Sequence, residues 1–201
     1  MEQAKKECIL RAATRAFARF GFRKASVDDI ARAAGVAKGT VYLACDSKED
    51  LFYQSLHREV RALIAEVAQQ IDPRVPADEL LARVSRSALE ALDDRPLVRD
   101  LFCGKVTATL PGWTAQLDEL RALGRANLIE ILRLGIRQGR FRGDLDLEEI
   151  AKLIQDLQIS TYLFHLRDLG PAERAGDRIG RRFAAALDLV LNGLRQKVAA
   201  A

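Results

Sequence analysis

The chain has 201 residues, of which 49% are hydrophobic, 6% aromatic and 30% charged, with a formal net charge of +4. This length allows one or two domains with a sizeable core, and a wealth of Ala, Leu, Arg and Glu without clusters of β-branched residues favours an all-α protein. The three cysteines form no CxxC or Cys/His cluster, which argues against a zinc site and favours reduced thiols in the cytoplasm. No apolar run is long enough to span a membrane, which argues against a membrane protein.

The first predicted helix runs from Lys5 to Phe20, and Gly21 is expected to end it. Its polar start argues against a signal peptide. Its buried stripe recurs at helical spacing and comprises Ile9, Ala13, Ala16, Phe17 and Phe20. Residues 1–45 carry 9 Lys/Arg against 4 Asp/Glu, so a basic segment precedes a nearly neutral remainder. Such a segment suits DNA binding, but charge alone fits an ordinary solvated surface equally well.

Two short helices joined by a glycine are predicted between residues 26 and 43. Ser26 is a good cap for the first helix, with Asp29 three residues later, as in a capping box. Gly35 supplies the left-handed residue that stops this helix. The outward face of the second helix carries no acidic residue: it offers Lys38, Gly39, Thr40 and Tyr42. This pattern is typical of a helix-turn-helix unit whose second helix enters a DNA major groove.

The order DDIARAAGVAKGTVY followed by SKEDLF resembles the N-terminal DNA-binding domain of the TetR family of transcriptional regulators. The resemblance begins at Ile9 and covers about the first third of the chain. It implies a ligand-responsive regulator, most often a repressor, that binds a palindromic operator as a homodimer. It also implies an all-α fold of about nine helices, in which a helix-turn-helix domain of three helices precedes a C-terminal helical bundle.

The positions that match the family's DNA contacts are Ser26, Lys38, Gly39, Thr40, Tyr42 and Lys48. A lysine ammonium reaches phosphates or base edges, a threonine offers a hydroxyl and a methyl group, and a tyrosine hydroxyl reaches a phosphate. Lys48 opens the next helix, whose N-terminal dipole also favours a phosphate. A role as a helix cap alone explains Ser26 equally well.

The chain departs from the family pattern at Leu43, Ala44 and Cys45, where an aromatic residue, a polar residue and a phenylalanine are usual. The missing polar side chain at position 44 should weaken a contact with the DNA backbone. The small Cys45 leaves space unless Phe22 or Phe52 fills it. We therefore expect DNA binding with an altered affinity or operator preference. Oxidant sensing by Cys45 is the alternative to a small packed thiol.

Ser47 and Asp50 predict a capping box at the start of a helix that continues to about Gln70. At about 1.5 Å per residue this helix is roughly 35 Å long, which is too long for a three-helix head alone. The expected organisation is therefore a DNA-binding domain at 1–47, a connecting helix at 48–70 and a ligand-binding and dimerisation domain at 71–201. The remaining predicted helices span 77–92, 95–110, 113–138, 147–169 and 172–198.

The last two helices are the predicted dimer interface, with ordinary packing within one chain as the alternative. Gly176, Gly180 and Ala184 recur every four residues and form a smooth ridge beside apolar positions. A two-fold dimer would place two recognition helices about one DNA turn, or roughly 34 Å, apart and so read a palindrome.

The resemblance implies that a small molecule binds within the C-terminal bundle. The candidate lining residues, each of which plain core packing explains as well, are Phe102, Trp113, Leu128, Leu157, Thr161, Tyr162, Phe164 and His165. The leucine-rich helices around them favour an apolar or aromatic effector.

Two alternatives compete with a DNA-binding regulator. The first is a helical dimeric ligand-binding or adaptor protein with weakened DNA binding, which the atypical Ala44 and Cys45 support. The second is a helical enzyme or carrier whose N-terminal head is structural, which is disfavoured because the sequence lacks a glycine-rich phosphate loop, a nucleophile motif and a carboxylate–histidine constellation. The two histidines, His57 and His165, are far apart and are not expected to bind metal. No enzymatic activity, cofactor or metal is therefore expected.

Overall fold

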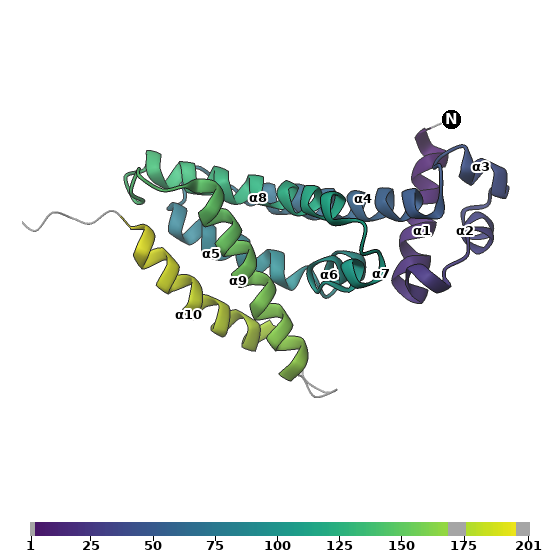
Figure 1. Cartoon of the computed structure of the whole chain (residues 1–201). Helices are drawn as coiled ribbons and strands as arrows, with labels where there is room; N and C mark the ends of the chain where they lie inside the picture. Colours follow the sequence, from purple (N-terminus) through teal and green to yellow (C-terminus); the bar gives the residue numbers. More distant parts are fainter. Residues whose placement is uncertain (1–2, 169–175, 196–201) are drawn as a thin grey trace, which may run out of the picture. The chain divides into compact units, whose positions relative to one another are not determined.

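The computed structural model describes residues 3–168 and 176–195, with only the backbone described at 165–168 and 176–180. Ten helices and no strand are found in the described residues, which confirms the predicted all-α class (Figure 1). Contacts divide the chain into two compact units. Unit 1 holds residues up to 62 together with 95–114, and unit 2 holds 63–94 and the residues from 115 onward. The functional boundaries predicted from the sequence divide the chain differently and stay a prediction.

Unit 1 is built on the helices α1 (Gln3–Lys24), α2 (Val27–Ala34), α3 (Lys38–Tyr42), the first part of α4 (Lys48–Ala68), α6 (Pro96–Phe102) and α7 (Lys105–Thr109). Its core has an aliphatic part, in which Ile9, Ile30 and Val41 are fully buried. It also has an aromatic part. The Phe17 and Phe52 ring centroids lie 4.9 Å apart, edge to face, and Trp113 packs 5.8 Å from Phe52.

The first helix differs from its predicted form at its C-terminal end. Gly21 does not end the helix but kinks it, with φ 72° and ψ 166°, and helical structure resumes as far as Lys24. Phe20, which was predicted to be buried, is 50% exposed. Phe22 lies beyond the kink and takes the inward position instead, 6.2 Å from the Phe17 ring. The glycine therefore decides which of the two phenylalanines enters the core, because only glycine adopts this backbone conformation without strain.

The predicted single helix over 95–110 is wrong, because the structure has two helices there, α6 and α7. Gly104 separates them in the left-handed conformation, with φ 74°. Leu97, Leu101 and Val106 remain buried on both sides of the break. The apolar spacing therefore continues through a point where the backbone turns, and for that reason the described chain has ten helices where about nine were predicted.

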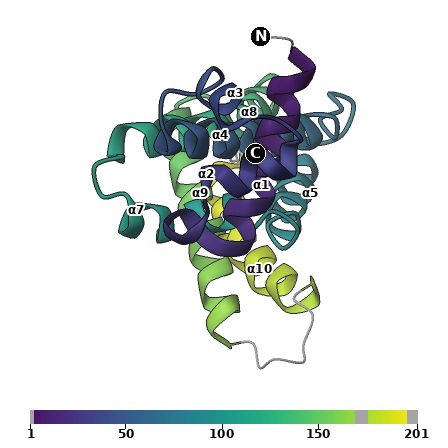
Figure 2. The ribbon, with the colours of Figure 1, turned by 90° about the vertical axis from the view of Figure 1, so that its right-hand side faces the viewer.

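Unit 2 contains the end of α4, α5 (Ala77–Glu90), most of α8 (Thr114–Arg137), α9 (Leu147–Asp168) and α10 (Gly176–Leu194). The helix α10 packs against both α9 and α5, and it runs beside α9 in Figure 2. Residues 172–175 and 196–198 of the predicted last helix lie outside the described residues. Its described part buries Phe183, Leu187 and Leu191, as an amphipathic helix should.

The end of α8 is closed by a buried ring. Phe141 is 2% exposed and lies against Gly135, where an added Cβ would fall 2.0 Å from the ring. Two backbone hydrogen bonds stabilise the turn between Gly139 and Phe141. The amides of Arg140 and Phe141 donate to the Gly135 carbonyl at 2.9 and 3.1 Å. Gly135 therefore serves the packing of unit 2, since any side chain there would meet the ring.

Asp78 is the most buried carboxylate that the structure describes in unit 2, at 8% exposure. It accepts two hydrogen bonds from Arg140, of 2.6 and 2.7 Å, and a longer contact of 3.5 Å from Arg195. The Arg140 guanidinium, which donates these bonds, holds the pKa of the Asp78 carboxyl below its ordinary value of 3.8. This bidentate pair fixes the start of α5 to the segment that follows α8.

An Asp78→Asn variant is expected to lower the free energy of unfolding by about 1–2 kcal/mol at pH 7, because one of the two hydrogen bonds from Arg140 is lost and the other is no longer accepted by a charged carboxylate. The folded pKa is depressed, so the ionised carboxylate stabilises the protein above pH 3.8 and this contribution is lost as the pH falls through the folded pKa. Urea unfolding of both proteins should show the difference at pH 7 and its loss below about pH 4. A difference that stays constant over this range would contradict the assignment.

Candidate nucleic-acid interface

The two helices of the predicted helix-turn-helix form as the local sequence dictates. The Ser26 hydroxyl accepts a bond from the Asp28 amide at 3.2 Å and so caps α2. In a capping box the Asp29 carboxylate would accept a hydrogen bond from the Ser26 amide. Here Asp29 forms an ion pair with Arg32 at 2.9 Å instead. Gly35 ends α2 in the left-handed conformation, with φ 68°.

The helix α3 presents one buried and one open side. Val41 is fully buried and anchors the helix to the core, whereas Tyr42 is 46% and Leu43 80% exposed. Gly39 is exposed, and a Cβ added there would meet nothing within 4 Å. Thr40 is half-buried beside it. The structure thus places four predicted DNA contacts, Lys38, Gly39, Thr40 and Tyr42, on one short helix, and the exposed Leu43 directly follows it.

Lys38, the first residue of α3, is already paired. Its Nζ atom donates to Asp28 Oδ2 of α2 at 2.9 Å. This hydrogen bond is the main reason that the pKa of the Lys38 ammonium is raised above its ordinary value. Lys38 is therefore positively charged at the neutral pH at which DNA binding is measured. The sequence predicts Lys38 as a DNA contact but gives no sign of its pair with Asp28, because ten residues separate the two.

Lys48 and Ser26 are positioned by contacts of their own. Lys48 Nζ donates to the Arg23 carbonyl at 3.3 Å and lies 4.8 Å from the centre of the Phe22 ring. The end of α1 and the start of α4 are thereby held together. Lys48 therefore has a role in unit 1 whether or not it also binds a phosphate, and the same holds for Ser26 as the cap of α2. Both stay predicted DNA contacts.

The atypical end of the helix-turn-helix is well packed. The Cys45 thiol is buried and donates to the Val41 carbonyl at 3.2 Å. Burial, followed by the charges of Asp50 and Asp46, raises the pKa of the Cys45 thiol to about 11. The thiolate needed for oxidation is therefore scarce at neutral pH, which favours a structural thiol. Gln54 Nε2 donates to the Ala44 carbonyl at 3.3 Å, so this turn is bonded to α4 through the backbone.

The start of α4 shows the predicted cap. The Ser47 hydroxyl accepts from the Asp50 amide at 3.0 Å, and Asp50 Oδ2 accepts from the Asp46 amide at 3.0 Å. The carboxylate thus reaches one residue further back than in the usual capping box. The ordered start of α4 fixes Lys48 beside the end of α1.

The predicted ligand-lining residues are divided between the units. Phe102 and Trp113 belong to unit 1, and the others belong to unit 2. In unit 2, Tyr162 is fully buried and donates to Asp93 Oδ1 at 2.7 Å. Phe164 is 46% exposed and lies under the Arg182 guanidinium at 4.9 Å. Leu128 and Thr161 are buried and Leu157 is half-buried, whereas the His165 side chain lies outside the described residues.

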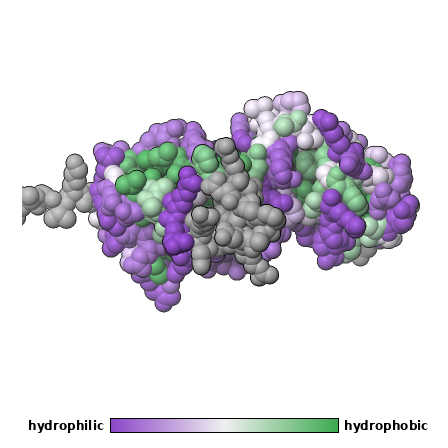
Figure 3. Space-filling view, turned by 90° about the horizontal axis from the view of Figure 1, so that it is seen from below, coloured by the Kyte–Doolittle hydropathy of each residue, from purple (hydrophilic) through white to green (hydrophobic). Residues whose placement is uncertain are grey.

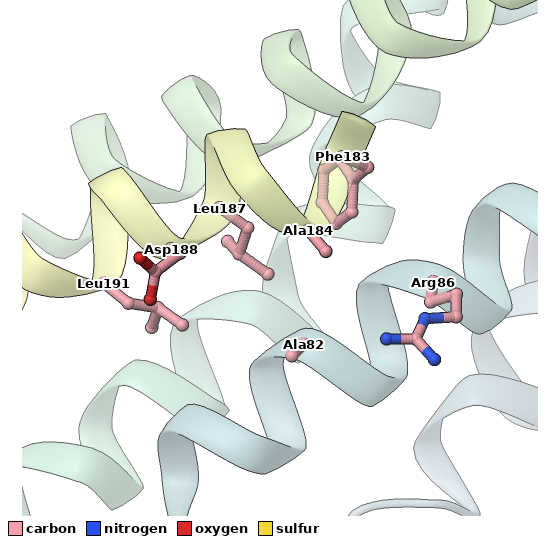
Figure 4. A pocket seen from close by; sticks show the side chains of 7 residues that line it. All are labelled: Ala82, Arg86, Phe183, Ala184, Leu187, Asp188 and Leu191. Atoms are coloured by element: carbon pink, nitrogen blue, oxygen red, sulfur yellow. The ribbon is translucent and has the colours of Figure 1, made fainter. Parts of the chain in front are cut away.

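A pocket of about 150 Å³ lies between α5 and α10 of unit 2 (Figure 4). Five of its lining residues are apolar, and the other two, Arg86 and Asp188, are charged. The lining residues are Ala82, Arg86, Phe183, Ala184, Leu187, Asp188 and Leu191. None of the predicted ligand-lining residues contributes to it, so the two sets stand as separate candidates.

Two further properties concern the residues that the structure describes. Among residues 3–168 and 176–195, no group of three or more His, Cys, Asp or Glu side chains is arranged to hold a metal ion. In the same residues no helix combines the length and the apolar character that crossing a membrane requires.

Comparison with known proteins matches residues 9–54 to the family model described as bacterial regulatory proteins of the tetR family. The HTH-type transcriptional repressor KstR2 of Mycolicibacterium smegmatis is 25% identical over 96% of this chain and 92% of its own length. The uncharacterized HTH-type transcriptional regulator YhgD of Bacillus subtilis is 30% identical, but over only 49% of this chain and 51% of its own. The solved structure of the regulator FadR from Bacillus subtilis in complex with stearoyl-CoA superposes with a TM-score of 0.74 at 21% identity, over 94% and 99% of the two chains.

Proposed function

We propose that the chain is a DNA-binding transcriptional regulator of the TetR family, a cytoplasmic homodimeric repressor that reads a palindromic operator and is released by a small molecule. In this proposal α3 enters the major groove and its residues from Lys38 to Tyr42 contact DNA. Lys48 and Ser26 contribute phosphate contacts at two helix starts. A non-enzymatic role agrees with the relatives, which are transcriptional regulators.

The observation that carries the proposal is Gly39. It lies inside a helix, where glycine destabilises by roughly 1 kcal/mol relative to alanine. No neighbouring atom lies within 4 Å of its missing Cβ, and its φ is not in the left-handed region. The fold of unit 1 therefore gives no reason for a glycine there. Close approach of the helix backbone to another molecule does give one.

The homodimer is supported by apolar residues that remain at the surface of unit 2. Leu153, Leu163 and Phe164 of α9 and Leu189 of α10 are 41–75% exposed. In Figure 3 hydrophobic residues reach the surface among hydrophilic ones. A second copy of the chain would cover such residues and set two α3 helices at the spacing of a palindrome. The predicted glycine ridge at Gly176 and Gly180 falls where no side chain is described.

We propose that the effector is an apolar or aromatic molecule and that its binding changes the affinity of the protein for DNA. Support comes from the leucine-rich interior of unit 2, with fully buried Leu80, Leu81 and Ile131. A regulator of the same fold, FadR from Bacillus subtilis, has been solved in complex with stearoyl-CoA, whose acyl chain is apolar. The predicted lining residues remain the candidates for this contact.

The alternative is a dimeric ligand-binding or adaptor protein with weakened DNA binding, which the absence of a polar side chain at Ala44 favours. Selection of a sequence from a random duplex library, followed by a gel shift at several salt concentrations, separates the two proposals. The wild type should select a palindrome and bind it less tightly as salt rises, because lysines release counterions from the DNA. Failure to select any sequence would favour the adaptor.

A Lys38→Ala variant tests the placement of the site. It should lower affinity for the selected operator by about 30-fold or more, because one specific contact of about 1–3 kcal/mol is lost in each of the two subunits. Its melting temperature should remain within about 2 °C of the wild type, because an exposed ion pair contributes little to folding. Unchanged operator affinity would remove Lys38 from the proposed contacts.

A further inference from the structure

The ion pair between Asp28 and Lys38 joins α2 to α3 on the surface proposed to read DNA. Lys38 is the first residue of α3, and Asp28 lies in the first turn of α2. The two charged atoms are 2.9 Å apart, and each side chain is a little more than half exposed. The ammonium that begins the proposed recognition helix therefore has an anionic partner before any DNA arrives.

This ion pair contributes little to the stability of the fold. Exposed ion pairs contribute little to stability, and α2 and α3 are already joined by other contacts. Ile30 and Val41 are fully buried between them and the core, and the Val36 amide donates to the Ala31 carbonyl at 3.0 Å. The consequence of the pair falls instead on DNA binding, because a group that approaches Lys38 also approaches Asp28.

Phosphates and base edges respond differently to that carboxylate. A phosphate oxygen carries a negative charge and is repelled by Asp28, whereas the guanine O6 and N7 atoms are uncharged acceptors. A lysine ammonium has three donors, so it can serve the carboxylate and a base edge together. Asp28 therefore opposes a phosphate contact by Lys38 through charge repulsion, and it does not oppose a base contact.

We propose that Asp28 is a specificity-determining residue that opposes phosphate binding by Lys38 on non-operator DNA and holds Lys38 towards a base edge on the operator. The proposal rests on the DNA-binding function proposed above. Asp28 is then a positioning residue, since it acts through Lys38. It raises the ratio of operator to non-operator affinity by weakening the non-operator complex.

The salt dependence of binding gives a direct readout. Each phosphate that a lysine neutralises adds about 0.9 to the steepness of log affinity against log salt. In an Asp28→Asn variant, Lys38 is free to bind a phosphate in each subunit of the dimer. The slope on non-operator DNA should therefore steepen by about 2, while the slope on the operator changes little.

The chain offers a matched control at the next position. Asp29 lies in the same first turn of α2 and is exposed, but it pairs with Arg32 of its own helix at 2.9 Å. Asp29→Asn therefore removes the same charge from the same helix end and leaves Lys38 paired. Thermal melting of both variants checks that each folds as the wild type does.

The experiment measures fluorescence anisotropy on the duplex that the wild type selects and on a scrambled duplex, over a range of salt. Asp28→Asn should bind the scrambled duplex about tenfold tighter, through phosphates that Lys38 now reaches, with operator affinity within about twofold. Asp29→Asn should change both affinities by one common factor. Adding Lys38→Ala to Asp28→Asn should abolish the gain on the scrambled duplex.

Equal effects of the two asparagine variants on the ratio of operator to non-operator affinity would overturn the inference, since the change in net charge would then explain both effects. A gain on the scrambled duplex that survives in the variant lacking Lys38 would overturn it as well. Both results require that the wild type selects a sequence, and so they leave the proposed function standing. A wild type that selects no sequence would overturn the proposed function, and this inference with it.

Discussion

A Gly39→Leu variant is expected to fold like the wild type and to lose operator affinity by about 100-fold or more. The side chain would point away from unit 1, where no atom lies within 4 Å of the added Cβ. Leucine also favours a helix by roughly 1 kcal/mol over glycine, so the free energy of unfolding should rise slightly. On DNA the same side chain would hold the α3 backbone away from the groove and displace its neighbours Lys38 and Thr40. The loss of these two contacts in each subunit corresponds to about 3 kcal/mol or more.

Affinity for the selected operator and the melting temperature, measured on the same sample, test this expectation. Gly39→Ala is the graded control, since one methyl group should give a smaller loss in binding and the same or higher stability. A Gly39→Leu variant that binds the operator as tightly as the wild type would show that α3 does not approach DNA through this residue. The proposed orientation of the helix would then be wrong.

A Gly135→Ala variant is expected to lower the free energy of unfolding by about 3 kcal/mol, although the same change stabilises most helices. The new Cβ would fall 2.0, 2.4 and 2.8 Å from three atoms of the Phe141 ring. Phe141 is 2% exposed, so the ring has no free space into which it can turn. Either α8 moves away from the ring or the ring leaves the core, and both cost several times the gain in helix propensity.

Gly124→Ala provides the control within the same helix. Its Cβ would lie 3.4 Å from Gln155 Nε2, which is ordinary contact with the end of a side chain. Thermal unfolding should therefore show Gly124→Ala unchanged or stabilised, and Gly135→Ala melting roughly 6–12 °C lower. Combining Gly135→Ala with Phe141→Leu should recover part of the loss, because the smaller side chain removes the overlap. Equal melting temperatures of the two alanine variants would contradict the close packing of Phe141.

Local signals in the sequence predicted the helix-turn-helix to within a few residues. Ser26 caps α2 and Gly35 ends it because hydrogen bonds at helix ends depend on residues only a few positions apart. The apolar spacing of α1, α5 and α8 likewise predicted helices and most of their buried sides. The all-α class follows from these local patterns together with composition, and so does the match of residues 9–54 to the TetR family.

Periodicity failed where the backbone turns while the apolar pattern continues. The stripe through Leu101 and Val106 gives no sign of the left-handed Gly104 that divides α6 from α7. Similarly, Phe20 and Phe22 are both plausible core residues on spacing alone, and the kink at Gly21 selects Phe22. The conformation of a glycine cannot be read from its neighbours' hydrophobicity, since glycine adopts positive and negative φ with similar ease.

By itself the sequence determined the helical class, the positions of the caps and the candidate face from Lys38 to Tyr42, because all of these depend on contacts within one or two helical turns. Tertiary structure alone decided that Asp28 holds Lys38, that Phe141 requires Gly135 and that Arg140 binds Asp78. Each of these pairs joins different elements, and the Arg140 and Asp78 pair spans 62 positions. The first and third of these contacts exist only once helices have packed, and the second depends on the turn that follows α8, so the apolar spacing along the chain carries no trace of them.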